Sequence, residues 1–118
     1  MSNQTLTKAY TAEAAVNAYR IVKFGSTDDL VVQGAAATDA VFGVVEGVAP
    51  AIGERCDVVL VGVAEVQLGG TVARGGAVVS NATGQGVASA AGNRAIGYAL
   101  ASGVSGDVVP VLLSPHTV

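Results

Sequence analysis

Apolar positions along this chain fall in short runs, which are separated by glycines and by short polar side chains. In residues 94–100, for example, Ile96, Tyr98 and Leu100 fall on one face of an extended chain and small residues fall on the other. Alternation with a period of two residues indicates a β-strand, as does a run of β-branched residues between turn signals. These patterns predict strands over residues 19–24, 30–33, 41–48, 54–61, 63–68, 77–80, 87–90, 94–100 and 108–113.

Glycine and proline refine these predicted strands. Gly43, inside one of them, indicates a bulge or a close approach of another backbone segment. Gly62 separates the strands predicted at residues 54–61 and 63–68. Pro110 lacks an N–H group, so we expect it at a sheet edge or at a bulge.

The first residues of the chain are more polar than the rest. Residues 5–10 alternate weakly, which is typical of an edge strand or of an extended tail. Thr11 has the side chain of a helix N-cap, and a short helix over residues 11–17 is the alternative. We therefore divide the chain into an extended N-terminal arm, residues 1–17, and a β domain, residues 18–118. Some eight to ten short strands predict an all-β fold, a small barrel or a sandwich.

Composition supports this fold class and excludes several functions. Apolar residues make up 51 % of the chain, with 22 valines and 21 alanines, whereas a helical bundle would need far more leucine. The net charge is −3 and only six residues are basic, so we expect no nucleic-acid partner. No apolar run approaches the roughly 18 residues of a membrane span, so we expect no membrane partner.

The residues that most often carry chemistry do not form a recognisable set. His116, the single histidine, lies close to the C-terminus, where we expect a solvated tail and neither catalysis nor a metal site. Cys56 is predicted to be a buried, inert thiol. Asp28 and Asp29 fit a turn, and Lys23 lies within a predicted strand, not at a hairpin tip where a carrier lysine would be presented. We predict no catalytic residue, no cofactor and no metal, and thus a structural or binding role.

Gly/Val-rich segments recur along the chain at residues 18–25, 41–46, 53–64, 75–84, 95–100 and 106–113. Taken in order, these segments resemble the small capsid decoration (cement) proteins of tailed bacteriophages. The resemblance covers nearly the whole chain and depends on the order, spacing and length of the segments.

The resemblance implies a non-enzymatic virion protein with a small β-barrel or β-tulip-like domain. Proteins of this kind are often homotrimers that sit on the outside of the head, over the junctions between major capsid subunits, and their arms pair with capsid segments. It therefore implies two partners, the major capsid protein and further copies of this chain, and synthesis in the host cytoplasm before attachment to the virion exterior. The arm residues expected to contact the capsid are Ser2, Asn3, Gln4, Thr5, Leu6, Thr7, Lys8, Ala9 and Tyr10.

Two other functions fit the same residues. Another β-rich virion component, such as a tail or spike protein, would share the fold and the absence of catalytic motifs. An enzyme or a small-ligand module would instead require a deep pocket with converging polar groups.

Overall fold

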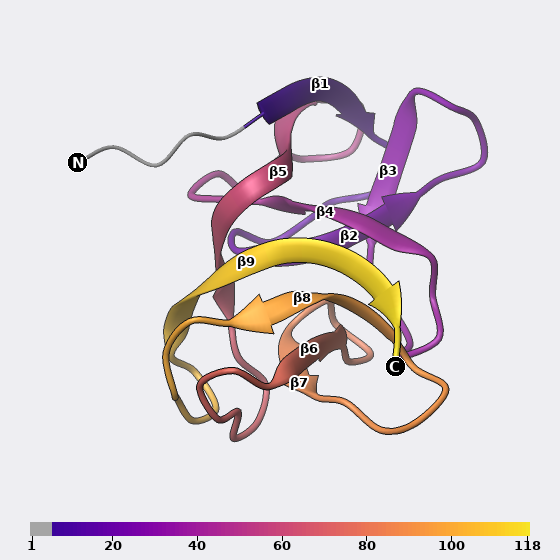
Figure 1. The fold of residues 1–118 in the computed structure, drawn as a ribbon. Coiled ribbons are helices and arrows are strands. Elements are labelled where there is room, and N and C mark those ends of the chain that lie inside the picture. The colour runs from indigo at the N-terminus through magenta and orange to yellow at the C-terminus, as the bar shows by residue number, and fades with distance from the viewer. Residues whose placement is uncertain (1–5) are drawn as a thin grey trace.

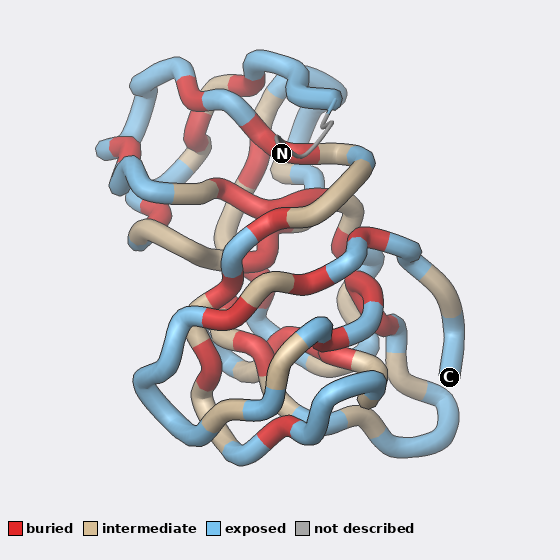
Figure 2. Tube along the Cα trace, turned by 60° about the vertical axis from the view of Figure 1, so that its left-hand side comes forward, coloured by how far each residue is buried: buried red, intermediate tan, exposed pale blue. Residues whose placement is uncertain are grey.

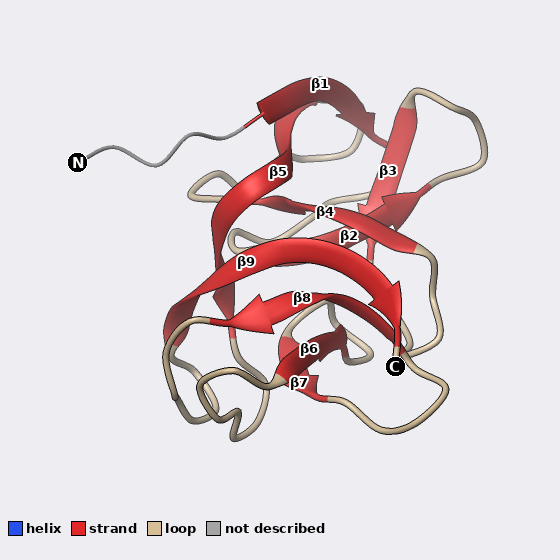
Figure 3. Ribbon diagram, in the orientation of Figure 1, coloured by secondary structure: helices blue, strands red, loops and turns tan. Residues whose placement is uncertain are grey.

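The computed structural model describes residues 6–118, and this part of the chain contains nine strands and no helix (Figure 3). The predicted all-β class is confirmed. The strands are β1 (Leu6–Ala12), β2 (Arg20–Phe24), β3 (Leu30–Gln33), β4 (Val41–Val45), β5 (Arg55–Gln67), β6 (Ala77–Ser80), β7 (Gly86–Ala88), β8 (Arg94–Ala99) and β9 (Val108–Thr117). None of these residues belongs to a helix that could span a membrane.

The first five strands close into a small barrel in the order β1-β3-β2-β4-β5, and β1 pairs with β5 to complete the ring (Figure 1). The β1–β5 ladder is antiparallel and runs from Leu6 to Thr11 on β1. The β1–β3 contact is parallel and short, limited to Thr11 opposite Leu30 and Ala12 opposite Val31. The barrel is therefore joined firmly on one side of β1 and only at its end on the other.

Strand β5 belongs to both halves of the molecule. Its first half pairs with β1, and from Gly62 to Gln67 it pairs with β9, which continues into a second sheet in the order β5-β9-β8-β6-β7. The prediction of two strands separated at Gly62 was therefore wrong. Gly62 has a φ of 106°, which a glycine adopts without steric cost. The strand can change direction there, where its partner changes, without being interrupted.

Each half of the molecule has its own apolar core. The barrel core takes buried side chains from all five barrel strands: Tyr10, Ala12, Val22, Val31, Val45, Cys56 and Val58, together with Val16 from the segment after β1. A second core lies between the outer side of β2, β4 and β5 and the second sheet, and Leu68 and Ile96 are completely buried in it. Figure 2 shows buried and exposed positions alternating along the chain, as half-buried strands require.

The segment expected to be an arm is part of the barrel where it is described. Residues 6–12 form strand β1, so a strand is confirmed here, although it has β5 on one side and β3 at its end on the other, and the helix alternative at residues 11–17 is wrong. Tyr10 is buried in the barrel core and Leu6 is exposed. The first five residues lie outside the described part of the chain, and the division at residue 17 stays a prediction.

Two of the special positions can be compared with their predictions. Gly43 is confirmed, because a Cβ there would lie 2.8 Å from the Val59 carbonyl oxygen, and the β2–β4 ladder shifts register beside it. Pro110 was expected at an edge or a bulge, but it lies in β9, between β5 and β8. Its carbonyl accepts a hydrogen bond from the N–H of Leu100, just beyond the last residue of β8. Pro110, which has no N–H to donate, therefore lies beside Leu100, where strand β8 has already ended.

Candidate interaction surfaces

The outer face of the second sheet carries a row of apolar side chains that runs across four strands. Val63 on β5 lies opposite Leu112 on β9, Leu112 lies opposite Tyr98 on β8, and Tyr98 lies opposite Ala77 on β6. Leu112 is 43 % exposed and Tyr98 is 39 % exposed, whereas their neighbours in sequence are buried in the core. Exposed apolar side chains that stand singly are ordinary, but a contiguous row is typical of a surface that contacts a partner.

His116 belongs to this face and not to a solvated tail, so the sequence interpretation of this residue was wrong. Strand β9 continues to Thr117, and His116 pairs with Ala95 on β8. The imidazole stacks on the Tyr98 ring with the ring centroids 4.9 Å apart and the planes 20° from parallel. Its Nδ1 lies 2.6 Å from the Ser114 carbonyl oxygen. His116 therefore extends the apolar row by one flat, half-buried ring.

The open side of β1 is a second candidate surface. From Leu6 to Tyr10 the strand pairs with β5 on one side, and its ladder with β3 begins only at Thr11. The backbone groups on the other side of this stretch have no strand partner among residues 6–118. An exposed, unpaired strand edge is a template for an extended segment of another chain. Lys8 belongs to this edge, and its ammonium lies 5.2 Å from the centroid of the Tyr10 ring.

Three aromatic side chains form a cluster that includes Tyr10. Phe24 and Phe42 stack with centroids 4.0 Å apart, and both rings meet the Tyr10 ring edge-on. Phe24 is 48 % exposed, so one side of the cluster is open to solvent. No local pattern in the sequence predicts this cluster. Its members come from three strands, and Phe42 lies at the register shift of the β2–β4 ladder.

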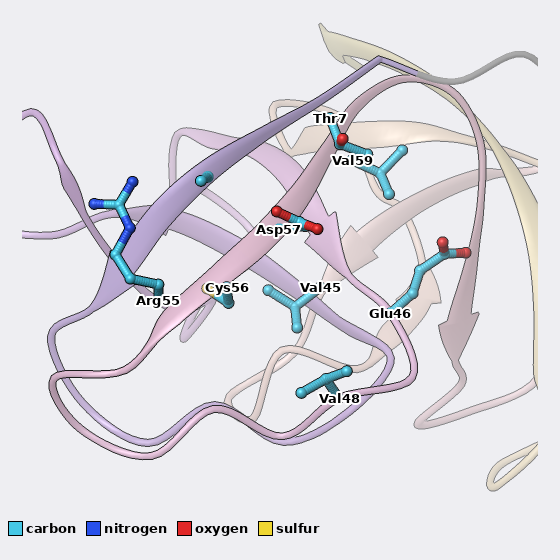
Figure 4. A pocket seen from close by; sticks show the side chains of 9 residues that line it. Thr7, Val45, Glu46, Val48, Arg55, Cys56, Asp57 and Val59 are labelled. Atoms are coloured by element: carbon cyan, nitrogen blue, oxygen red, sulfur yellow. The ribbon is translucent and has the colours of Figure 1, made fainter.

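A pocket lies on the face of the β1–β5 ladder that carries Thr7 and Ala9, beside the turn after β4 (Figure 4). Cys56 contributes to its floor and is buried, as predicted. Burial raises the pKa of the Cys56 thiol above its ordinary value; the Asp57 carboxylate acts in the same direction, and the Arg55 guanidinium opposes both. Cys56 is thus held as a neutral thiol at neutral pH, and a low thiolate population makes a poor nucleophile.

The remaining predicted positions lie apart from one another. Lys23 lies within β2, as predicted, and its Nζ is 3.1 Å from a carboxylate oxygen of Asp39. Asp29 forms an ion pair with Arg55, with 3.2 Å between a carboxylate oxygen of Asp29 and Nη1 of Arg55. No group of three or more metal-ligating side chains occurs within residues 6–118.

Comparison with known proteins gives these surfaces a context. The model of the phage cement protein family matches residues 1–113 of the chain. The chain belongs to the phage cement protein family. It is thus a member of a family of structural phage head proteins. No curated protein matches the sequence.

The fold is also found in a solved structure. The crystal structure of the head fiber gp8.5 N base in bacteriophage phi29 superposes with a TM-score of 0.73. The match covers 98 % of this cement protein and 98 % of the phi29 chain, at 19 % sequence identity. At this identity the likeness concerns the fold, including the barrel and the second sheet.

Proposed function

We propose that this cement protein binds the outside of a phage head as a homotrimer and stabilises the shell by bridging major capsid subunits. Its membership of the phage cement family supports a role on the head. The observation that carries the proposal is the apolar row Val63–Leu112–Tyr98–Ala77, whose central side chains Leu112 and Tyr98 stay exposed on a domain with two apolar cores of its own. Such a row is typical of an interaction surface, and further copies of this protein are the partner we infer for it.

The capsid contact is proposed to lie in residues 2–10, the segment that ends in the open edge of β1. Its unpaired backbone side supports this assignment, because strand addition supplies a series of main-chain hydrogen bonds without demanding a particular sequence. Such bonds contribute about 0.5–1.5 kcal/mol each. Three copies held in one trimer would bind the shell with an avidity far above that of one copy.

The test is binding to phage heads that were assembled without this protein. The purified chain should sediment with expanded heads, and a reconstruction of the decorated heads should show extra density on the outer surface, between capsid subunits. Absence of binding to heads would overturn the proposal. Binding to tails instead of heads would favour a tail or spike component.

A further inference from the structure

The pocket beside the β1–β5 ladder has a volume of about 440 Å³. Pockets that bind small ligands in proteins fall in the range of roughly 300–1,000 Å³. Thr7 and Ala9 of β1 line one side of this pocket, and Val45, Val48 and Val59 give it an apolar lining. Figure 4 shows Val45 and Val48 below Asp57, on the side of the pocket away from Thr7 and Val59.

The charges around this pocket are unbalanced. Asp57 and Glu46 line it, and neither carboxylate forms an ion pair with a cation within residues 6–118. The third charged residue, Arg55, is already engaged: its Nη1 lies 3.2 Å from Asp29 and 3.3 Å from the Thr11 hydroxyl. Figure 4 shows its guanidinium directed away from the two carboxylates. The pocket thus combines an apolar floor with two uncompensated negative charges.

One of these carboxylates is held in place by the backbone. Glu46 Oε2 accepts a hydrogen bond from the N–H of Glu65, with 2.6 Å between nitrogen and oxygen. This bond fixes the side chain across the turn after β4. Asp57 is positioned by its place in the β1–β5 ladder, opposite Ala9. A ligand that meets both groups therefore has less side-chain entropy to remove on binding.

We propose that this pocket receives an arginine or lysine side chain from an extended segment of the head shell protein. The identity of that partner rests on the proposed function. The aliphatic stem of such a side chain would cover the valines, and its charged end would meet Asp57 and Glu46. An apolar occupant would bury the two carboxylates without a counter-charge, which is costly. An anion would be repelled.

The position of the pocket fits the same partner segment. Thr7 and Ala9 line it, and both belong to the stretch of β1 whose other backbone side is open. A shell segment that pairs with the open edge of β1 would run beside the pocket, and a basic side chain on it would reach the carboxylates. Main-chain pairing would supply affinity, and the pocket would fix the register of the two chains.

The first experiment uses the protein alone, with N-acetylarginine amide as the probe and its uncharged analogue N-acetylcitrulline amide as the control. Backbone amide NMR signals of Ala9, Glu46 and Asp57 should shift and saturate with the arginine probe, and the citrulline probe should leave them nearly unchanged. Asp57→Asn should weaken the arginine probe about fivefold or more, in line with loss of one partly desolvated ion pair. Asp28→Asn removes the same charge from an exposed turn and should leave the affinity unchanged. Equal effects of the two variants, or equal binding of both probes, would overturn the proposal.

The second experiment separates this proposal from the proposed function. Wild-type protein, Asp57→Asn and Asp28→Asn are compared for binding to expanded heads. Weaker binding by Asp57→Asn alone supports the pocket, and equal binding by all three proteins refutes the pocket while the head-binding function stands. Wild-type protein that fails to bind heads refutes the function itself. Self-association that is lost only in Asp57→Asn would assign the pocket to a second copy of this chain and would also refute the proposal.

Discussion

Gly97 of β8 approaches the backbone of Leu112 of β9 so closely that a Cβ at residue 97 would lie 1.9 Å from the Leu112 carbonyl oxygen. This close approach sits beside the register shift between Ala95 and Gly97 in the β8–β9 ladder. The shift places Tyr98 opposite Leu112, and it leaves His116 positioned to stack on Tyr98. A single backbone contact thus sets the arrangement of the exposed apolar row.

Gly97→Ala should therefore destabilise the fold strongly. The added methyl group meets backbone that cannot rotate away, so the two strands must separate, at a cost of about 3 kcal/mol or more. Chemical denaturation monitored by circular dichroism measures the change. Gly70→Ala is the control, because its Cβ would meet only Val87 at an ordinary 3.6 Å. Similar stabilities of the two variants would show that the β8–β9 contact is more adaptable than the geometry indicates.

Leu112→Lys should convert the proposed trimer into monomers while leaving the domain folded. The side chain is 43 % exposed at the centre of the apolar row, so a charge there costs little in the monomer but must be desolvated in an interface. Sedimentation velocity at micromolar concentration measures the species present. Ile52→Lys makes the same change at an apolar residue that is 72 % exposed in a turn before β5, and it should remain trimeric. A trimer that persists in Leu112→Lys would place the self-association surface elsewhere.

The strands and most of their positions could be predicted from the sequence because valine runs and turn residues report local structure. The closure of the barrel could not, since the β1–β3 and β1–β5 contacts join segments whose pairing is set by the whole fold. Gly62 shows the same limit: a glycine between two apolar runs resembles a strand boundary, yet here it lets one strand serve two sheets. Tyr19 has a φ of 60°, a conformation that its side chain disfavours and that no local pattern predicts.

The candidate surfaces were only partly predictable. The family resemblance implies a capsid contact at residues 2–10, and whether they contact a capsid stays a prediction. The apolar row could not be found in advance, because Leu112 and Tyr98 belong to strands whose register includes a bulge. The pocket could not be predicted either, because Glu46 follows β4 and Asp57 lies on β5, and only the pairing of these two strands brings both residues to one pocket.

Asp39 should make the protein more stable at neutral pH than at acid pH. Burial alone would raise the pKa of this carboxyl, but hydrogen bonds from the Ala35 and Ala36 amides and the nearby Lys23 ammonium outweigh it, and the pKa is lowered. A folded-state pKa below the unfolded value, about 3.9, stabilises the fold above that pH, and the effect is lost as the pH falls through the folded pKa.

Asp39→Asn should thus lower the free energy of unfolding by about 1 kcal/mol at pH 7, a typical loss for one charge-assisted contact. The difference from the wild type should shrink as the pH falls below about 4. Urea denaturation at several pH values measures both quantities. Asp28→Asn, at a position in an exposed turn, should show no such pH dependence, and parallel curves for Asp39→Asn and the wild type would contradict the assignment.

Cys56 should make the protein less stable at alkaline pH than at neutral pH. Its pKa is raised in the folded state, so the thiolate forms more readily in the unfolded chain, and the fold loses stability as the pH rises above about 8.5. Cys56→Ala cannot ionise at this position and should keep its fold and its head binding. The stability of the wild type relative to Cys56→Ala should therefore fall between pH 7 and pH 10. A constant difference over that range would show that the thiol is accessible to solvent.

The proposed capsid contact requires a test that leaves the barrel closed. Deleting residues 2–10 would remove most of the β1–β5 ladder together with Tyr10, which is buried in the barrel core, so we expect that variant to be largely unfolded. Leu6→Asp and Lys8→Glu change only exposed side chains of the same strand. Both should unfold at denaturant concentrations close to that of the wild type. Both should bind expanded heads at least about tenfold more weakly, because a changed charge at a contact surface disturbs its electrostatic complementarity with the partner. Arg74→Glu reverses one charge in an exposed turn between β5 and β6 and should bind normally. Normal head binding by the two β1 variants would exclude this edge as the capsid contact, whatever the remainder of the chain does.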